Sequence, residues 1–379
     1  MNEIHMSESK LKRLESLDVA RGFDMLWISG LSALVVSVCK ALGYGPETAV
    51  ARQMEHPAWH GFHFIDLVFP TFIFIAGISF PFSLAKQREH GVGTRKIVAR
   101  IFKRIIVLFL LGLVYNGILK DGPASTVYGS VLGRIGLAWG GAALLTVFLR
   151  LHIRVALAVL ILVGYWLVGV CLSAPDHSGA SPLSMEGCFA GWLDRLLLPG
   201  KLTVPGVISY QGVLSTLPAV VTALLGVFTG EYIRLPRTSG ERKSLVLVLA
   251  SVFLLFAGLF IAFGCGRFSF PLNKILWSPS FTLVSAACSL ALFAGCYFLT
   301  DVKGWWKRTL FFRVIGMNAL TIYLVQRVVG FRPASSFLFG WLGSLAPAGW
   351  EPVVVDVGYI ALCWLFLLVL YRNKLFFKV

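Results

Sequence analysis

Ten apolar stretches recur along this 379-residue chain, and each is close to the length that crosses a bilayer. A helix needs about 20 apolar residues to span the hydrocarbon core. The stretches lie approximately at 23–42, 64–85, 101–119, 128–149, 153–174, 210–233, 245–264, 277–299, 310–330 and 353–371. Because 57% of the residues are hydrophobic and only 14% are charged, the composition argues against a soluble globular protein. We expect an all-α, polytopic membrane protein with about ten transmembrane helices, forming a single domain over residues 1–379.

The basic residues are distributed unevenly between the two sides of these spans. Of the 34 Lys and Arg residues, 24 fall in segments on the side that holds the N-terminus, and nine fall on the other side. Loops rich in Lys and Arg remain in the cytoplasm. We therefore place both termini in the cytoplasm, with residues 1–22 as a cytoplasmic segment, and expect the membrane to be the bacterial inner membrane. This distribution also favours lipid contact over nucleic-acid binding as the explanation of the net charge of +16.

The segment from His56 to Ser79 joins a titratable cluster to an apolar span. It reads HPAWHGFHFIDLVFPTFIFIAGIS, with His56, His60, His63 and Asp66 at the predicted outer end of the second span. Ionisable groups at the mouth of a membrane helix are costly and usually mark function. Interfacial packing is the alternative interpretation. An imidazole titrates near neutral pH and can accept a proton from a reacting group, so this cluster is the candidate reaction site.

Polar residues inside other spans are further candidates for the site. Arg134 lies about two turns inside the outer end of a glycine-rich span, where a guanidinium should face the bundle and pair with a carboxylate such as Asp66 or with a ligand anion. Asn318 lies near the middle of the ninth span, where an amide serves either as a contact between helices or as a ligand group. Asn273 and Lys274 lie in the outer loop PLNKILWS.

Two basic segments lie at the predicted cytoplasmic surface. Arg21 stands between Asp18 and Asp24 at helical spacing, which indicates either an ion-paired helix entry or part of a ligand mouth. In the 86–104 loop, Arg100, Lys103 and Arg104 form one cationic face at the start of the third span. Anionic lipid head groups explain such a face, and the alternative is a docking surface for the phosphates of a cofactor.

Other motifs are weak or missing. The sequence contains no phosphate-binding glycine loop and no HExxH motif. His56 and His60 have a spacing that suits a metal ligand pair, but Pro57 separates them and no second pair exists, so we expect no metal. The seven cysteines have no metal-type spacing, and Cys188 and Cys265 are predicted outside the membrane, where a disulfide between them is an open alternative.

Six segments, taken in order, resemble one family of membrane acetyltransferases. They are RLESLDVARGFDM, HPAWHGFHFIDLVFPTFIFIAGIS, YGSVLGRIGLAW, GVLSTLPAVVTALLGVFTG, PLNKILWSPSF and GMNALTIYL. Together they are similar to the bacterial relatives of heparan-α-glucosaminide N-acetyltransferase, a lysosomal membrane enzyme that uses cytosolic acetyl-CoA to acetylate a terminal glucosamine in the lumen. The resemblance covers residues from about 13 to 330.

The resemblance at His56, Trp59 and Asp66, together with the chemistry of acetyl transfer, suggests roles for several residues. The family's catalytic histidine matches His56, which would act as a base or accept the acetyl group, and Asp66 would orient an imidazole or bind the acceptor ammonium. The acceptor, a small amino sugar, would meet Trp59, Arg134, Asn273, Lys274 and Asn318. The co-substrate acetyl-CoA would bind through Arg21, Arg100, Lys103 and Arg104. The resemblance also implies a homodimer.

The chain departs from the family in two ways. The family enzyme has an asparagine before its catalytic histidine, whereas the loop GYGPETAVARQMEH has none. We also expect no large lumenal domain, which makes a small amino sugar or cell-envelope fragment a more natural acceptor than a polymer. A secondary transporter for a sugar remains the alternative function, because intramembrane charges and a midplane asparagine also fit that class.

Overall fold

The computed structural model describes residues 14–377 except 178 and 237, so most of the predicted cytoplasmic segment 1–22 lies outside the described part. All regular elements of the described residues are helices, and the only β-type pairing among them is three isolated bridges. The prediction of an all-α fold is therefore confirmed.

Eight helical stretches of the described chain are long and apolar enough to cross a membrane. They are α1 to α2 (Glu15–Ala41), η2 to α4 (Phe64–Glu89), α7 (Val131–Phe148), α8 (Leu151–Cys171), α10 (Thr216–Ile233), α11 to η4 (Gly240–Gly264), α12 to η6 (Pro279–Val302) and α16 (Glu351–Arg372). The other helices are α3 (Ala49–Arg52), α5 (Thr94–Tyr115), α6 (Ile118–Asp121), α9 (Phe189–Leu197), α13 (Leu310–Met317), α14 (Ala319–Val328) and α15 (Phe331–Ser344). The exact number of ten spans and the sidedness of the termini stay predictions.

Several predicted spans begin at different residues in the structure, among them those of α5 and α10. α5 begins at Thr94, seven residues before the predicted start, because the basic residues of this segment are good helix formers and continue the helix into its charged end. α10 begins at Thr216 rather than at 210, and residues 210–215 belong to the preceding loop. The shift of α10 matters for the site, since it leaves residues 210–215 on a loop.

Two of the predicted spans contain a break within the described part of the chain. The first breaks in η1 (Trp27–Leu31), where Gly30 has a φ of 116°, a conformation that residues with a side chain rarely adopt. The predicted ninth span breaks at Asn318 into α13 and α14. Such breaks leave backbone groups without helical partners, which a membrane protein tolerates where the break lies within protein or lines a cavity.

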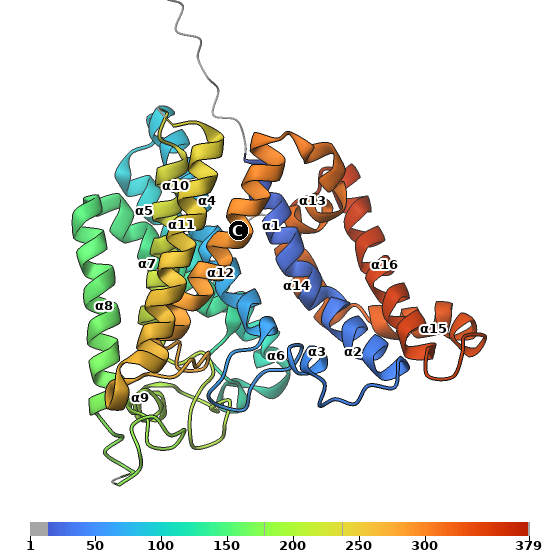
Figure 1. Ribbon diagram of the computed structural model, residues 1–379, viewed down its shortest axis with the longest axis horizontal. Coiled ribbons are helices and arrows are strands. Elements are labelled where there is room, and N and C mark those ends of the chain that lie inside the picture. Colours follow the sequence, from blue (N-terminus) through green and yellow to red (C-terminus); the bar gives the residue numbers. More distant parts are fainter. Residues whose placement is uncertain (1–13, 178, 237, 378–379) are drawn as a thin grey trace, which may run out of the picture.

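The helices form two groups that meet along α1 (Figure 1). The large group contains α4, α5, α7, α8, α10, α11 and α12, and the small group contains α1, α2 and α13 to α16. Glycines allow the closest contact within the small group: a Cβ on Gly316 of α13 would lie 1.8 Å from the carbonyl oxygen of Asp18 in α1. α1 also packs against α12 and α4, which joins the two groups.

The helix α4 (Val68–Glu89) lies at the centre of the large group. It packs against α10, α12 and α7, and a Cβ on its Gly77 would lie 2.2 Å from the carbonyl oxygen of Ala223 in α10. Phe74 and Ile78 of α4 are fully buried in this contact. Because α4 is held on several sides, the short helix η2 (Phe64–Leu67) at its start is fixed where the loops of the predicted outer side converge.

Candidate functional site

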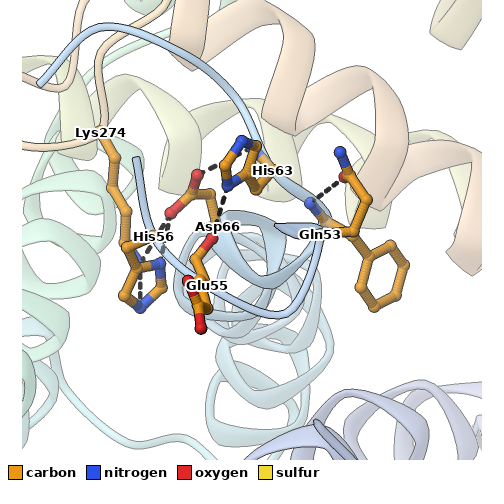
Figure 2. A network of polar contacts seen from close by, with 7 residues as sticks. Gln53, Glu55, His56, His63, Asp66 and Lys274 are labelled. Atoms are coloured by element: carbon orange, nitrogen blue, oxygen red, sulfur yellow. Dashed lines mark hydrogen bonds and ion pairs between the residues drawn. The ribbon is translucent and has the colours of Figure 1, made fainter. Parts of the chain in front are cut away.

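The centre of the candidate site is a cluster of His56, Asp66 and Lys274 (Figure 2). The Nδ1 atom of His56 lies 2.6 Å from Oδ1 of Asp66, and Nζ of Lys274 lies 3.3 Å from the same oxygen. Nζ of Lys274 is also 3.3 Å from each ring nitrogen of His56. Asp66 is fully buried, whereas the side chain of His56 is 56% exposed. An imidazole is thus held by a buried carboxylate with one edge open to a ligand.

Local backbone contacts hold Asp66 in this position. Its second oxygen, Oδ2, accepts a hydrogen bond of 3.0 Å from the backbone N–H of His63, just before η2. The next backbone N–H, that of Phe64, donates to Oε1 of Gln53 at 2.7 Å (Figure 2). Carboxylates near a helix start are favoured because they satisfy free N–H groups there. Within the sequence HFID, the backbone N–H of the histidine thus holds the carboxylate of the aspartate in place.

Lys274 reaches the site from a strained turn before α12. Trp277 is fully buried and has a φ of 52°, which is unusual for a bulky residue. The turn is fixed by hydrogen bonds from Trp277 N–H to the carbonyl of Lys274 and from Leu276 N–H to Oδ1 of Asn273. The indole N–H of Trp277 donates to Thr222 in α10. Strain of this kind persists where the surroundings fix the backbone, and here it aims Lys274 at Asp66.

Asn273 and His60 connect this turn to the histidine loop. Nε2 of His60 lies 3.0 Å from the carbonyl oxygen of Leu183, so this nitrogen carries the proton and donates. Nδ1 then accepts from the amide of Asn273 at 3.3 Å. The backbone N–H of Gly61 donates to the carbonyl of Leu272 at 2.9 Å, with Gly61 at a φ of 140°. Asn273 is fully buried and positions these loops, while its predicted contact with the acceptor stays untested.

Burial shifts the charge state of two groups in these loops. It lowers the pKa of Lys274, and the carboxylate of Asp66 opposes that shift. Burial also lowers the pKa of His60, which the hydrogen bond to Leu183 partly offsets. Burial thus favours the neutral form of His60, and Asp66 favours the charged form of Lys274 against the effect of burial.

The cluster opens into a cavity of about 480 Å³, which we call the histidine cavity. Its polar lining consists of His56, Asp66, Lys274, Arg134 and Gln211 together with Tyr210 and Trp59. The remaining lining is largely apolar and comes from η1, the start of α4, α7 and α14. A pocket with a few convergent polar groups on an apolar wall is typical of a small-molecule site.

Arg134 is the second charged group of this cavity. It stands in the first turn of α7 and is 2% exposed. The prediction that it pairs with Asp66 is wrong: its Nη2 donates to the carbonyl of Gly212 at 3.2 Å and to the hydroxyl of Ser215. The pairing fails because Asp66 is already engaged by His56 and Lys274. Nε and Nη1 of Arg134 have no hydrogen-bond acceptor among the described residues. A buried guanidinium with two unused donors is suited to bind an oxygen atom of a ligand.

A second cavity of about 350 Å³, the arginine cavity, adjoins the first. It lies between α1, α4, α5, α7 and the break between α13 and α14, and its charged lining is Asp18, Arg21 and Arg104. Both cavities share Ile28, Phe69, Val131 and Tyr323 as lining residues. The two spaces therefore abut and extend from the arginines to His56.

The four predicted cofactor-binding residues separate into two pairs. Arg21 and Arg104 line the arginine cavity. Nη2 of Arg21 donates to Ser79 at 2.5 Å, and Arg104 lies 4.1 Å above the ring of Trp139. Arg100 and Lys103 are exposed, and Arg100 donates to Gln87. The predicted cationic face is thus divided, because Arg104 faces the helix bundle while Arg100 and Lys103 are exposed.

Other predicted residues have mixed outcomes. Trp59 lines the histidine cavity and donates from its indole to the carbonyl of Leu183 at 2.8 Å. Asn318 is buried at the break between α13 and α14, beside the arginine cavity's Met317 and Ala319, and its own role stays a prediction. Cys188 and Cys265 are free thiols that donate to backbone carbonyls of Met185 and Phe260, so the alternative of a disulfide between them is wrong.

Sequence reasoning missed Tyr210 and Gln211, which line the histidine cavity. Both lie inside the predicted span 210–233, whereas the helix begins only at Thr216 and leaves them on the loop. The sequence SYQG, with Gly212 after the two polar residues, is a signal for a loop that could have found them. His56 and His60 do not converge on a common point, since each has a different partner, and over the described residues no group of three potential metal ligands forms.

The fold and the site together define a multi-pass membrane protein in which a histidine, held by a buried carboxylate, lines an internal cavity. No family model matches the chain. It is 26% identical to heparan-alpha-glucosaminide N-acetyltransferase from Mus musculus and from Homo sapiens, over 98% and 97% of its length. The chain spans about 60% of the length of these two relatives. These matches show a distant family relationship to this N-acetyltransferase.

Proposed function

We propose that this protein is a membrane N-acetyltransferase that moves an acetyl group from cytoplasmic acetyl-CoA to the amine of a small amino sugar at the outer face of a bacterial inner membrane. The observation that carries the proposal is the pair of abutting cavities, which leads from Arg21 and Arg104 to the His56–Asp66 pair. The distant relationship to an N-acetyltransferase supports the same reaction class.

In the proposed reaction His56 acts as the base. With Nδ1–H donated to Asp66, the lone pair of His56 is on Nε2, which lies 3.3 Å from Nζ of Lys274. The acceptor amine takes the place of Lys274 at Nε2 and gives up its proton there. The amine nitrogen forms a bond to the thioester carbonyl carbon, and the carbon–sulfur bond then breaks. The thiolate leaves with the proton that His56 has taken up, so the products are the N-acetyl sugar and CoA. Transfer of the acetyl group to His56 itself is the alternative order of steps.

The two cations of the histidine cavity support this reaction electrostatically. Nε and Nη1 of Arg134 are free to donate to the oxygen of the thioester carbonyl as negative charge develops on it. Lys274 and Arg134 together exceed the single negative charge of Asp66. A positive local field disfavours an ammonium group, so it favours the neutral amine that attack requires.

Acetyl-CoA would enter from the arginine side. Its phosphates match the guanidinium groups of Arg21 and Arg104. The pantetheine arm carries two amides, and the breaks at η1 and at Asn318 leave backbone groups near the shared lining that could satisfy them. Tyr210, Gln211 and Trp59 remain for the hydroxyl groups of the acceptor.

The test is transfer of radiolabelled acetyl from acetyl-CoA to glucosamine by purified protein in detergent. We expect transfer by the wild type, and loss of transfer but retained acetyl-CoA binding in His56→Ala. His63→Gln is the matched control, because the ring of His63 bonds to the carbonyl of Glu55 and stands outside the cavity lining. A wild type that neither binds acetyl-CoA nor acetylates any amino sugar would sink the proposal.

A secondary transporter for a sugar is the second candidate, and one observation favours it. Interrupted helices at a cavity are common at transporter binding sites, and this chain has two of them, at Gly30 and Asn318. Uptake of labelled glucosamine into vesicles that contain the protein and no acetyl-CoA would favour this candidate. Absence of such uptake together with acetyl transfer would exclude it.

A further inference from the structure

The segment after α16 turns sharply back toward the helix bundle. Lys374 has a φ of 55°, and its backbone N–H donates to the carbonyl of Tyr371, while Leu375 N–H donates to the carbonyl of Leu370 at 2.9 Å. This pair of bonds around a left-handed residue is a common helix end that reverses the chain direction. The ring of Phe376 then packs edge-on against Tyr371, with centroids 6.3 Å apart. The turn fixes where the next side chain goes.

That next side chain, Phe377, belongs to the wall of the arginine cavity. It lines the same space as Arg21 and Arg104, although it is far from both in sequence. About half of its side chain is exposed, so an aromatic face is available to a ligand beside the two guanidinium groups. The combination of cationic groups and an accessible ring matches a ligand that has both negative charge and a flat aromatic part.

We propose that Phe377 binds the adenine ring of acetyl-CoA by stacking, so that the segment after α16 holds the nucleotide at the entrance of the arginine cavity. This inference rests on the proposed function, because it takes acetyl-CoA as the ligand. The phosphates contact Arg21 and Arg104, and the base, which is planar and apolar on its faces, covers the ring of Phe377. Stacking of a base on an aromatic side chain changes affinity by about 5- to 150-fold when the side chain is removed.

The alternative for this segment is a plug that occupies the entrance and opposes binding. The two roles predict opposite effects of removing the ring. Loss of a stacking partner weakens binding of acetyl-CoA, whereas loss of a plug strengthens it. Neither role is shared by Phe376, whose ring packs on Tyr371.

The experiment compares two acyl donors on the full-length protein in detergent. Dissociation constants are measured by calorimetry for acetyl-CoA and for S-acetylpantetheine, which keeps the thioester and the pantetheine arm but lacks the nucleotide. We expect Phe377→Ala to bind acetyl-CoA about 5- to 150-fold more weakly and S-acetylpantetheine as the wild type does. Phe377→Tyr should restore acetyl-CoA binding, and Phe376→Ala should not change it.

Three outcomes would overturn the inference. Unchanged binding of acetyl-CoA by Phe377→Ala removes the stacking role, and tighter binding replaces it with the plug. An equal loss for both donors would mean that the substitution disturbs the cavity rather than the nucleotide contact. If the wild type binds neither S-acetylpantetheine nor acetyl-CoA measurably, the proposed function itself is overturned, and this inference with it.

Discussion

Nδ1 of His56 lies 2.6 Å from Oδ1 of Asp66, although His56 belongs to a loop and Asp66 to the short helix η2 at the start of a membrane helix. The fully buried carboxylate fixes which ring nitrogen of His56 carries the proton and leaves the lone pair on Nε2, in a side chain that lines the histidine cavity. A base oriented in this way does not depend on the exposed loop alone for its geometry. Asp66 is therefore as important for the proposed chemistry as His56.

Replacement of Asp66 by Asn should lower kcat for acetyl transfer by on the order of 10²- to 10⁴-fold. The amide cannot accept from His56, His63 and Lys274 together, so the imidazole loses its fixed orientation. The measurement is kcat with saturating acetyl-CoA and glucosamine, with acetyl-CoA affinity expected to stay unchanged. A variant with wild-type kcat would show that Asp66 only supports the fold.

Replacement of Arg134 by Gln should reduce kcat by about 10²- to 10³-fold with little change in acetyl-CoA affinity, since in the proposed reaction its two unused donors bind the developing oxyanion. Steady-state kinetics on both substrates separate the two effects. Arg154→Gln is the matched control. Arg154 is also a buried arginine, but its Nη2 pairs with Oε1 of Glu231 at a distance of 3.0 Å, and it does not line the histidine cavity. Equal losses in the two variants would indicate a general effect of removing a buried arginine.

Replacement of Arg104 by Gln should weaken acetyl-CoA binding by about 10- to 150-fold, because its guanidinium lines the arginine cavity. The change Lys103→Gln at the neighbouring residue should leave acetyl-CoA binding unaltered, since the side chain of Lys103 is exposed on the surface of α5. Calorimetric titration of both variants measures the difference. If Lys103→Gln loses as much affinity as Arg104→Gln, the phosphates bind on the surface of the helix rather than in the cavity.

The protein should lose thermal stability as the pH falls below about 6.5, the ordinary pKa of histidine, in part through His60. Burial lowers the pKa of His60 in the folded state, so the unfolded chain takes up the proton first and acid favours unfolding. Protonation also removes the acceptor that Asn273 needs at Nδ1. Unfolding midpoints at pH 5.5 and 7.5 should differ less in His60→Gln than in the wild type. Identical pH dependence in both proteins would remove His60 as a contributor.

Substitution of Gly316 by Ala should destabilise the protein by about 1–3 kcal/mol or more, because the new Cβ would overlap the backbone of α1. Gly295→Ala in α12 is the control: a Cβ there has nothing within 4 Å, and alanine favours a helix. Denaturation followed by circular dichroism should rank Gly316→Ala below the wild type and Gly295→Ala at or above it. The opposite order would mean that α1 and α13 separate without cost.

Several features follow from local sequence, and among them the all-α membrane class was predicted correctly. The length of the apolar stretches predicts that they form membrane helices, because backbone N–H and C=O groups in hydrocarbon must form their hydrogen bonds within the same segment. The candidate base and its carboxylate, His56 and Asp66, are ten residues apart, close enough for one local segment to bring them together. Helix ends were less well predicted, as at Thr94 and Thr216, because caps and charged turns are weak local signals.

By itself the sequence determined that this protein is a bundle of membrane helices with a histidine and a carboxylate at one mouth, because hydropathy and short-range spacing depend only on neighbouring residues. Only the tertiary structure decided that Lys274 joins this pair from 208 positions beyond Asp66, and that Arg134 turns to Ser215 instead of Asp66. The same holds for Arg104 lining a cavity while Lys103 does not. These outcomes depend on how helices distant in sequence pack and on which carboxylate is already occupied, and neither is encoded in any single segment.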